Sequence, residues 1–261
     1  MSRERASFGP DTLLERMAQF PVPERYWVGF SGGADSTALL LALQELTARL
    51  NAPIHAVHFD HGLQAQSADW AEHCEAFCKT RDIPFLKRSL EMGQDPGSSP
   101  EERARNARYR EVESILGERE MYLTAHHADD QAETLFLNLM RGSGVEGLAG
   151  IPAIRTLGGG WVARPLLDFQ RDDLTGYLAQ TDTRWLEDPS NVETVFDRNY
   201  LRNRVFPMLE KRWPGVGARL TRTARNARIS ATALAAFIER QSGDLLGDRV
   251  RMPLQKLLGF D

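Results

Sequence analysis

Short strand-like runs alternate with longer helical patterns along the first two-thirds of this chain. The predicted buried strands cover residues 25–30, 54–59, 84–90 and 121–124. The predicted helices cover residues 35–50, 67–81, a stretch that begins at Pro100, and residues 128–140. Strands and helices that alternate in this order form a parallel sheet with helices on both faces. The sequence therefore predicts an α/β fold with a doubly wound, mostly parallel sheet.

The remaining third of the chain has a different pattern. Residues 141–160 are rich in glycine, which predicts a loop, and a further strand is predicted over residues 161–164. From Phe169 onward the apolar residues recur at helical spacing. We therefore expect one large domain over residues 1–215, followed by a smaller helical region over residues 216–261.

The composition indicates a globular, cytoplasmic protein. Of the 261 residues, 42% are hydrophobic and 26% are charged, and the formal net charge is −4. The N-terminus lacks the apolar core of a signal peptide, and no run approaches the roughly 18 apolar residues of a membrane helix. Cys74 and Cys78 match neither a redox pair nor a zinc pattern, so we interpret them as packing residues. No membrane partner is expected.

The segment between the first predicted strand and its helix has the composition of a phosphate-binding loop. Its residues are Ser31, Gly32, Gly33, Ala34, Asp35 and Ser36. Ligands of parallel sheets bind beyond the carboxyl ends of strands, and two glycines let N–H groups face an anion at the helix N-terminus. Asp35 would repel a bare phosphate, which indicates a bridging Mg²⁺. The alternative is an ordinary strand-to-helix turn. Neither the P-loop kinase motif nor the Rossmann motif occurs here.

The sequence Ser-Gly-Gly-Ala-Asp-Ser in this position resembles the pyrophosphate-loop signature of the N-type ATP pyrophosphatases. The resemblance implies an adenine nucleotide alpha hydrolase-like fold, with residues 1–215 as the catalytic domain. It also implies that residues 31–36 bind ATP, that Asp35 takes part in binding the metal, and that the loop holds the pyrophosphate released from ATP.

A second polar cluster directly follows the fourth predicted strand. If a helix begins near Ala128, then His126, Asp129 or Asp130, and Glu133 fall on one face beside the loop. Acidic residues also suit the first turn of a helix, so the alternative is a capped surface helix. Two adjacent histidines and two adjacent aspartates at a strand end favour a functional site. We therefore predict as catalytic residues Asp35, His126, Asp129, Asp130 and Glu133.

The stretch His-His-Ala-Asp-Asp-Gln-Ala-Glu-Thr at residues 126–134 is similar to the tRNA(Ile)-lysidine synthetase family. Further stretches agree in the same order, at residues 58–63, 101–109, 141–148, 187–191 and 198–202. The resemblance implies that O2 of the wobble cytidine, position 34, of a tRNA(Ile) with a CAU anticodon attacks the α-phosphate of ATP. The amine of free L-lysine then displaces AMP, which gives lysidine and changes codon reading from AUG to AUA.

Carboxylates and arginines have implied roles in that reaction. Asp129, Asp130 and Glu133 are available to hold the lysine ammonium group or to accept a proton, and the sequence does not assign these roles individually. The candidates for contacts with tRNA or the adenylated intermediate are Arg105, Arg108, Arg198 and Arg202. For each arginine a surface ion pair is an equal alternative.

The C-terminal part of the chain is basic. Between Asp197 and Arg228 there are nine basic and two acidic residues. Such a segment on an acidic protein suggests a polyanionic partner, although a solvated helix face explains it equally well. Arg219, Arg222, Arg225 and Arg228 recur every three residues, and we expect them to follow a tRNA backbone along one helix face.

The family resemblance also bears on size and on the alternatives. Members of the family extend well past this length, so we interpret residues 216–261 as truncated before further tRNA-binding domains. A homodimer is compatible with the sequence, which does not determine the oligomeric state. A tRNA thiolation enzyme would need cysteines near the site, and an amidotransferase would need a glutaminase. A nucleotide-binding sensor would explain the loop but not the acidic cluster.

Overall fold

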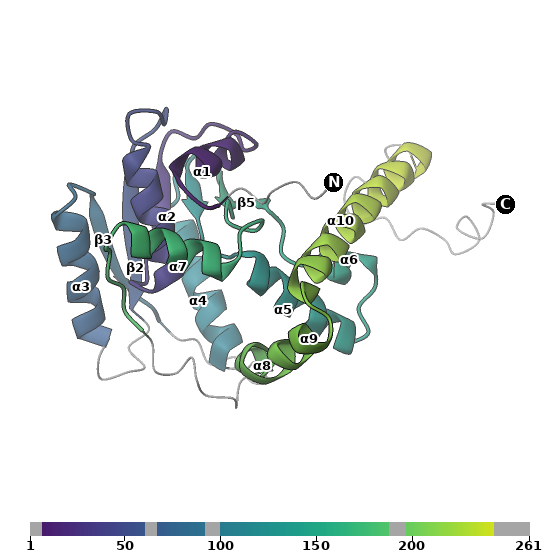
Figure 1. The fold of residues 1–261 in the computed structure, drawn as a ribbon. Coiled ribbons are helices and arrows are strands. Elements are labelled where there is room, and N and C mark those ends of the chain that lie inside the picture. Colours follow the sequence, from purple (N-terminus) through teal and green to yellow (C-terminus); the bar gives the residue numbers. More distant parts are fainter. Residues whose placement is uncertain (1–6, 61–66, 92–99, 188–196, 243–261) are drawn as a thin grey trace.

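The computed structural model describes residues 7–60, 67–91, 100–187 and 197–242 (Figure 1). The predicted loop at residues 92–99 lies outside these ranges, as do residues 61–63 and 188–191 of the family motifs. Within the described residues, no helix is both long enough and apolar enough to cross a membrane.

A six-stranded sheet forms the centre of the molecule, with the strand order β3-β2-β1-β4-β6-β5. Its strands are β1 Tyr26–Gly29, β2 Ile54–Asp60, β3 Phe85–Ser89, β4 Met121–Leu123, β5 Ile154–Leu157 and β6 Gly160–Ala163. β5 runs antiparallel to β6, and the other neighbours are parallel. The chain moves from β1 outward to β3 and then returns to β4 on the other side. Ligands of such sheets bind where the order reverses, here between β1 and β4. The predicted doubly wound, mostly parallel sheet is confirmed.

Side chains alternate along the strands between two hydrophobic cores, one on each face of the sheet. Val28 and Leu123 belong to the larger core, whereas Trp27 and Tyr122 belong to the smaller one. The helices that contribute to the larger core are α1 Pro10–Met17, α2 Ala34–Glu45, α3 Ser67–Lys79 and α7 Arg171–Gln180. On the other face, α4 Pro100–Ile115 covers the smaller core. Because both faces are covered, the strands are apolar on both sides.

α2 lies at the centre of the larger core and is buried on most sides. Its predicted inner residues Leu39, Leu40 and Leu43 are fully buried, and Leu46 just beyond its end is also buried. The helix ends at Glu45, five residues before the predicted end at residue 50. A helix that is apolar nearly all round belongs in a core. The start of α2, and therefore the loop that precedes it, is held firmly in place.

The prediction that residues 141–160 form a loop was wrong in part. They contain the helical turn α6 Val145–Leu148 and the edge strand β5. β5 and β6 form a hairpin that turns through Gly158, whose φ is +54°. The glycines mark this turn, but four-residue elements are too short to show a helical or strand period. The conformation of α6 and β5 therefore depends on contacts with neighbouring elements. The longer helix α5 Ala128–Met140, by contrast, has the bounds that its sequence predicts.

The C-terminal helices pack across α5. They are α8 Asp197–Tyr200, the π-helical turn η2 Leu201–Val205, α9 Phe206–Arg212 and α10 Val216–Ser242. The ring of Phe206 meets that of Phe136 on α5, edge to face, with centroids 5.9 Å apart. The first half of α10 contacts α5 and α6 through Thr221 and Arg228, and its far end extends away from the sheet (Figure 1). The division into two domains at residues 215/216, where α10 begins, stays a prediction.

Candidate active site

Residues 31–36 connect β1 to α2 at the carboxyl edge of the sheet. Gly32 has a φ of +80°, which favours glycine. A Cβ atom added there would lie 3.0 Å from Leu186 Cδ1 and 3.1 Å from Cys74 Sγ. A side chain at Gly32 would therefore strain the turn and push the loop away from its supports.

The hydroxyl groups of Ser31 and Ser36 hold this loop together. Ser36 Oγ accepts a hydrogen bond from Ser31 N at 3.2 Å and donates one to Gly33 O at 3.0 Å. The two hydroxyl oxygens lie 3.0 Å apart, and Ser31 Oγ accepts from Gly33 N at 3.3 Å. Because the first N–H groups of a helix have no intrahelical partners, the start of α2 offers donors to an anion. The loop is thus preorganised for phosphate.

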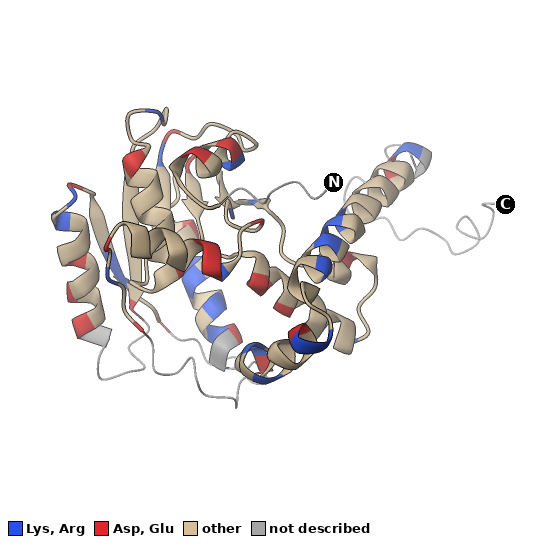
Figure 2. Cartoon of the chain, in the orientation of Figure 1, with Lys and Arg blue, Asp and Glu red and all other residues tan. Residues whose placement is uncertain are grey.

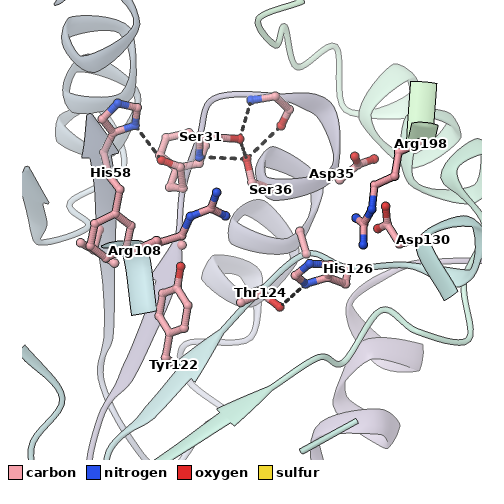
Figure 3. Close-up of a pocket in the computed structure, with 16 residues that line it drawn as sticks. Ser31, Asp35, Ser36, His58, Arg108, Tyr122, Thr124, His126, Asp130 and Arg198 are labelled. Atoms are coloured by element: carbon pink, nitrogen blue, oxygen red, sulfur yellow. Dashed lines mark hydrogen bonds between the residues drawn. The ribbon is translucent and has the colours of Figure 1, made fainter. Parts of the chain in front are cut away.

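A cavity of about 310 Å³ opens beside the loop (Figure 3). Predicted site residues from four parts of the chain line it: Ser31, Gly33, Asp35, Ser36, Arg108, His126, Asp130 and Arg198. This volume is at the lower end of the range for small-molecule sites, which is about 300 to 1,000 Å³. The structure therefore brings most of the loop and part of the acidic cluster into one cavity. The predicted residues outside its lining are Gly32, Ala34, Arg105, Asp129, Glu133 and Arg202.

His127 lies at the centre of the acidic cluster, although the sequence prediction selected its neighbour His126. Its Nε2 is 3.5 Å from an oxygen of Asp35 and 3.5 Å from an oxygen of Asp130, and its Nδ1 is 3.3 Å from Asp129. Burial disfavours the charged imidazole, but the three carboxylates outweigh burial and raise the pKa of His127 to about 10. His127 therefore links these three carboxylates at the start of α5. The signal for it was the second histidine of the pair at the start of α5.

Asp35 carries an oxygen that lacks a partner. Its Oδ1 is buried and has no hydrogen-bond donor among the described residues, and Arg171 Nε lies 3.9 Å away. A buried carboxylate oxygen without a donor is costly, which indicates that a ligand completes it. In the described ranges, no group of three or more His, Cys, Asp or Glu side chains could hold a metal ion. Mg²⁺ is often bound by one or two carboxylates together with substrate phosphates, and Asp35 beside the loop fits that mode.

Glu133 and Arg202 form a bidentate ion pair behind the cavity. Arg202 Nε donates to Glu133 Oε1 at 2.8 Å, and Arg202 Nη2 donates to Glu133 Oε2 at 3.1 Å and to Asp130 Oδ1 at 3.3 Å. Burial raises the pKa of Glu133, while Arg202 acts in the opposite direction. Asp130 and Glu133 thus share one face, as predicted. Asp129 faces α7 instead, where it accepts a hydrogen bond from Arg171 N at 2.8 Å.

His126 lines the cavity as a neutral imidazole. Its Nδ1 lies 2.7 Å from Thr124 Oγ1. Burial lowers the pKa of His126 to about 3, with Arg164 and Arg198 acting in the same direction and Asp130 against them. An imidazole with so low a pKa stays neutral and is a weak base, because an efficient general base has a pKa near the working pH.

The opposite wall of the cavity carries residues to which the sequence prediction gave no role. The phenol of Tyr122 packs directly against Gly29, where a Cβ atom would collide with its hydroxyl group. His58 Nδ1 lies 2.9 Å from Phe30 O, and burial lowers the pKa of His58. Both side chains stand on strands that flank β1, next to Arg108 in the same cavity (Figure 3). Their strand positions were visible in the sequence, but the cavity they share was not.

The two cysteines are packing residues, as predicted. Cys74 and Cys78 are free and buried in the larger core, and Cys74 lies beneath the loop at Gly32. Burial raises the pKa of each thiol to about 12. A protonated, buried thiol is a poor nucleophile, so neither cysteine offers a sulfur carrier.

The four arginines of α10 do not form one stripe, so that prediction was wrong. Three residues of an α-helix turn through about 300°, and therefore Arg219 and Arg228 lie on roughly opposite sides of the helix. Arg228 Nη2 donates to the carbonyl oxygens of Ala149 and Gly150 at 3.1 and 3.0 Å, at the end of α6. Arg219 donates to backbone carbonyl oxygens of the turn before α10.

Comparison with known proteins gives matches over most of the chain. Residues 11–209 match the PP-loop domain family. A tRNA(Ile)-lysidine synthase of Pseudomonas syringae pv. tomato is 47% identical over 82% of this chain and 48% of its own length. The protein of that name from Coxiella burnetii is 40% identical over 89% of this chain and 52% of its own length. The protein of that name from Legionella pneumophila strain Paris is 39% identical over 95% of this chain and 56% of its own length.

Among solved structures, a U34-tRNA thiolase from Methanococcus maripaludis has a similar fold. The TM-score is 0.67 with 16% sequence identity, over 83% of this chain and 77% of that chain. At this identity the likeness concerns the fold alone. The chain spans about half the length of the curated relatives that it matches.

Proposed function

We propose that this chain, which belongs to the PP-loop domain family, carries the site that attaches lysine to C2 of the wobble cytidine in a tRNA(Ile) with a CAU anticodon. The reaction is a carbon–nitrogen ligation that converts ATP to AMP and pyrophosphate. One observation carries the proposal: the phosphate loop and Asp130 line one cavity, in a chain 39–47% identical to proteins named tRNA(Ile)-lysidine synthase.

The cavity suits the first step, in which O2 of the cytidine bonds to the α-phosphorus of ATP. The bond from that phosphorus to the bridging oxygen breaks, and pyrophosphate leaves against the loop. Ser31 and the N–H groups at the start of α2 provide donors for its charge, and Ser36 holds the loop in shape. Arg108 and Arg198 line the same cavity, so their positive charges are available to stabilise the phosphate of the adenylated cytidine.

Mg²⁺ is part of this proposal through Asp35. The unpartnered Asp35 Oδ1 beside the loop would hold the ion together with ATP phosphates. When bound, Mg²⁺ neutralises charge that develops on the phosphate oxygens. Asp35 itself is fixed by His127, which lies 3.5 Å from its other oxygen.

The second step requires a neutral lysine amine at C2. The nitrogen bonds to C2, the C2–O2 bond breaks, AMP leaves, and the amine loses protons. Asp130 also bonds Arg202 and the backbone of His127, but it lines the cavity and Asp129 and Glu133 do not, so it is the carboxylate best placed to hold the lysine ammonium group before deprotonation. His126 lines the same cavity, but its lowered pKa makes it a weak base, so it is suited to hydrogen-bond the reacting groups while the protons leave to water.

The test is lysine-dependent chemistry on a defined RNA. We expect the 261-residue chain to release pyrophosphate from ATP and to incorporate radioactive lysine into a tRNA(Ile) transcript with a CAU anticodon. A transcript with guanosine at position 34 and reactions without lysine are the controls. A folded chain that binds ATP but incorporates no lysine at any protein concentration would overturn the proposal. A homodimer stays a prediction, which light scattering of the same sample tests.

A further inference from the structure

We propose that the outer side of α8, η2 and α9 is a platform on which unpaired RNA bases stack next to the cavity. This α8–α9 face consists of Tyr200, Arg204, Lys211, Arg212 and Trp213. The inference rests on the proposed function, because it takes RNA as the substrate. It goes further by naming the surface and the structural state of the RNA that the surface binds.

The inner side of these helices is fixed by contacts with α5. Leu201 is buried, Arg202 bonds Glu133, and the Phe206 ring packs on Phe136. Arg198, near the start of the same stretch, lines the cavity. One side of these helices thus belongs to the candidate active site, and the opposite side is held at a fixed distance from it. A nucleotide in the cavity would have its neighbours within reach of this surface.

The outer side exposes large rings. Tyr200 is 52% exposed and Trp213 is 54% exposed, with Met208 between them at 74%. The side chains of residues 200, 204, 208, 211 and 212 are all exposed, whereas Leu201 and Phe206 between them face α5. Exposed rings are suited to stacking on unpaired bases, since every base has a π-face. The backbone of Trp213 is held at both ends, because its N–H donates to Leu209 O and its carbonyl accepts from Arg219.

The charge of this surface is positive and is not neutralised within the part of the chain that the structure describes. No carboxylate there pairs with Arg204, Lys211 or Arg212. The nearby acid Glu210 is used for another purpose, because its carboxylate accepts hydrogen bonds from the backbone of Gly215 and Val216 at the start of α10. Basic residues gather on α8 and α9 in Figure 2. Rings flanked by free cations fit a polyanion with exposed bases.

A hairpin RNA distinguishes this platform from other surfaces. The probe is a 17-nucleotide hairpin with a seven-nucleotide loop that contains CAU, and a fully paired duplex of the same length is the comparison. We expect Trp213→Ala and Tyr200→Ala each to raise the Kd for the hairpin about tenfold. Trp213→Phe keeps a ring and should restore most of the affinity. The duplex offers no unpaired bases, so its Kd should change by less than about threefold in each variant.

The cations are tested by salt dependence. In the triple variant Arg204→Gln, Lys211→Gln and Arg212→Gln, the slope of log Kd against log salt should fall by roughly 0.7 for each lost phosphate contact. A control variant replaces Lys79, at the end of α3, and Arg49, in the turn after α2, with Gln, and its slope should equal that of the wild type. An unchanged slope in the triple variant would overturn the charged part of the platform.

The variant Met208→Ala distinguishes RNA from a protein partner as the occupant of this surface. A protein segment that covers this surface would bury Met208 with the rings, so Met208→Ala would then weaken its binding as much as Trp213→Ala does. For RNA stacking, Met208→Ala should leave the Kd for the hairpin within about twofold of wild type. Equal losses from both variants, or unchanged hairpin binding by Trp213→Ala, would refute the platform.

The platform and the proposed function can be refuted independently of each other. If the wild type incorporates lysine and Trp213→Ala binds and modifies RNA normally, the platform is refuted and the function stands. If hairpin binding depends on Trp213 and Tyr200 but no lysine is incorporated, the platform stands and the function is refuted. Circular dichroism of each variant checks that the exposed substitutions leave the fold intact.

Discussion

The ion pair between Arg202 and Glu133 is tested by replacing Arg202 with methionine, which keeps the bulk of the side chain but removes its charge. The Glu133 side chain is 1% exposed, and Arg202 donates to both of its oxygens. Breaking a buried pair by removing one partner costs about 3 to 5 kcal/mol, because the remaining charge has no compensation. We expect Arg202→Met to lower the free energy of unfolding by that amount. The melting temperature should fall by roughly 10 °C.

The loss should depend on pH in a defined direction. Burial raises the pKa of Glu133 in the folded protein, and without Arg202 that pKa rises further. The stability contributed by a carboxyl whose folded pKa is raised is present below its unfolded pKa of about 4.3, and it is lost as the pH rises through the folded pKa. The deficit of Arg202→Met relative to wild type should therefore be larger at pH 8 than at pH 5.

Urea unfolding, followed by far-ultraviolet circular dichroism at both pH values, measures this deficit. The matched control is the double variant Arg202→Met with Glu133→Gln, in which no buried carboxylate remains. We expect the double variant to recover at least about 2 kcal/mol of the loss, because the two residues are in direct contact. A deficit below about 1 kcal/mol, an equal deficit at both pH values, or no recovery in the double variant would refute this reading of the pair.

Three further predictions concern the site and the cysteines. Asp35→Asn should lower ATP-dependent pyrophosphate release by at least about 100-fold with little change in urea midpoint, because it removes the proposed Mg²⁺ ligand; wild-type rates with unchanged Mg²⁺ dependence would contradict this. Asp130→Asn should reduce lysidine formation on the order of 10²-fold, and a loss of only severalfold would limit Asp130 to a structural role at the start of α5. Because burial raises the pKa of Cys74 and Cys78 to about 12, neither thiol should react with a chromogenic disulfide at pH 8 in the native protein, whereas both should react in guanidinium; rapid native labelling would show that the thiols are accessible.

The sequence predicted the parallel sheet, the loop and the start of α5 because each has a local signal. The strands are short apolar runs, Gly32 needs a positive φ, and the apolar period of residues 128–140 matches α5. It did not predict α6 and β5, which are too short to show a period. It also placed the arginines of α10 on one face, although a spacing of three moves around an α-helix.

The sequence alone determined which chemical groups meet at the carboxyl edge of the sheet. The order of strands and helices fixes that edge, and local motifs place Ser31, Asp35, His126 and Asp130 at the ends of β1 and β4. Only the tertiary structure decided how these charges are distributed, because a side chain's electrostatic environment depends on residues far along the chain. Arg202 lies 69 residues from Glu133 in the sequence and yet neutralises it. The pKa is raised at His127 and lowered at His126, since three carboxylates from two helices surround His127.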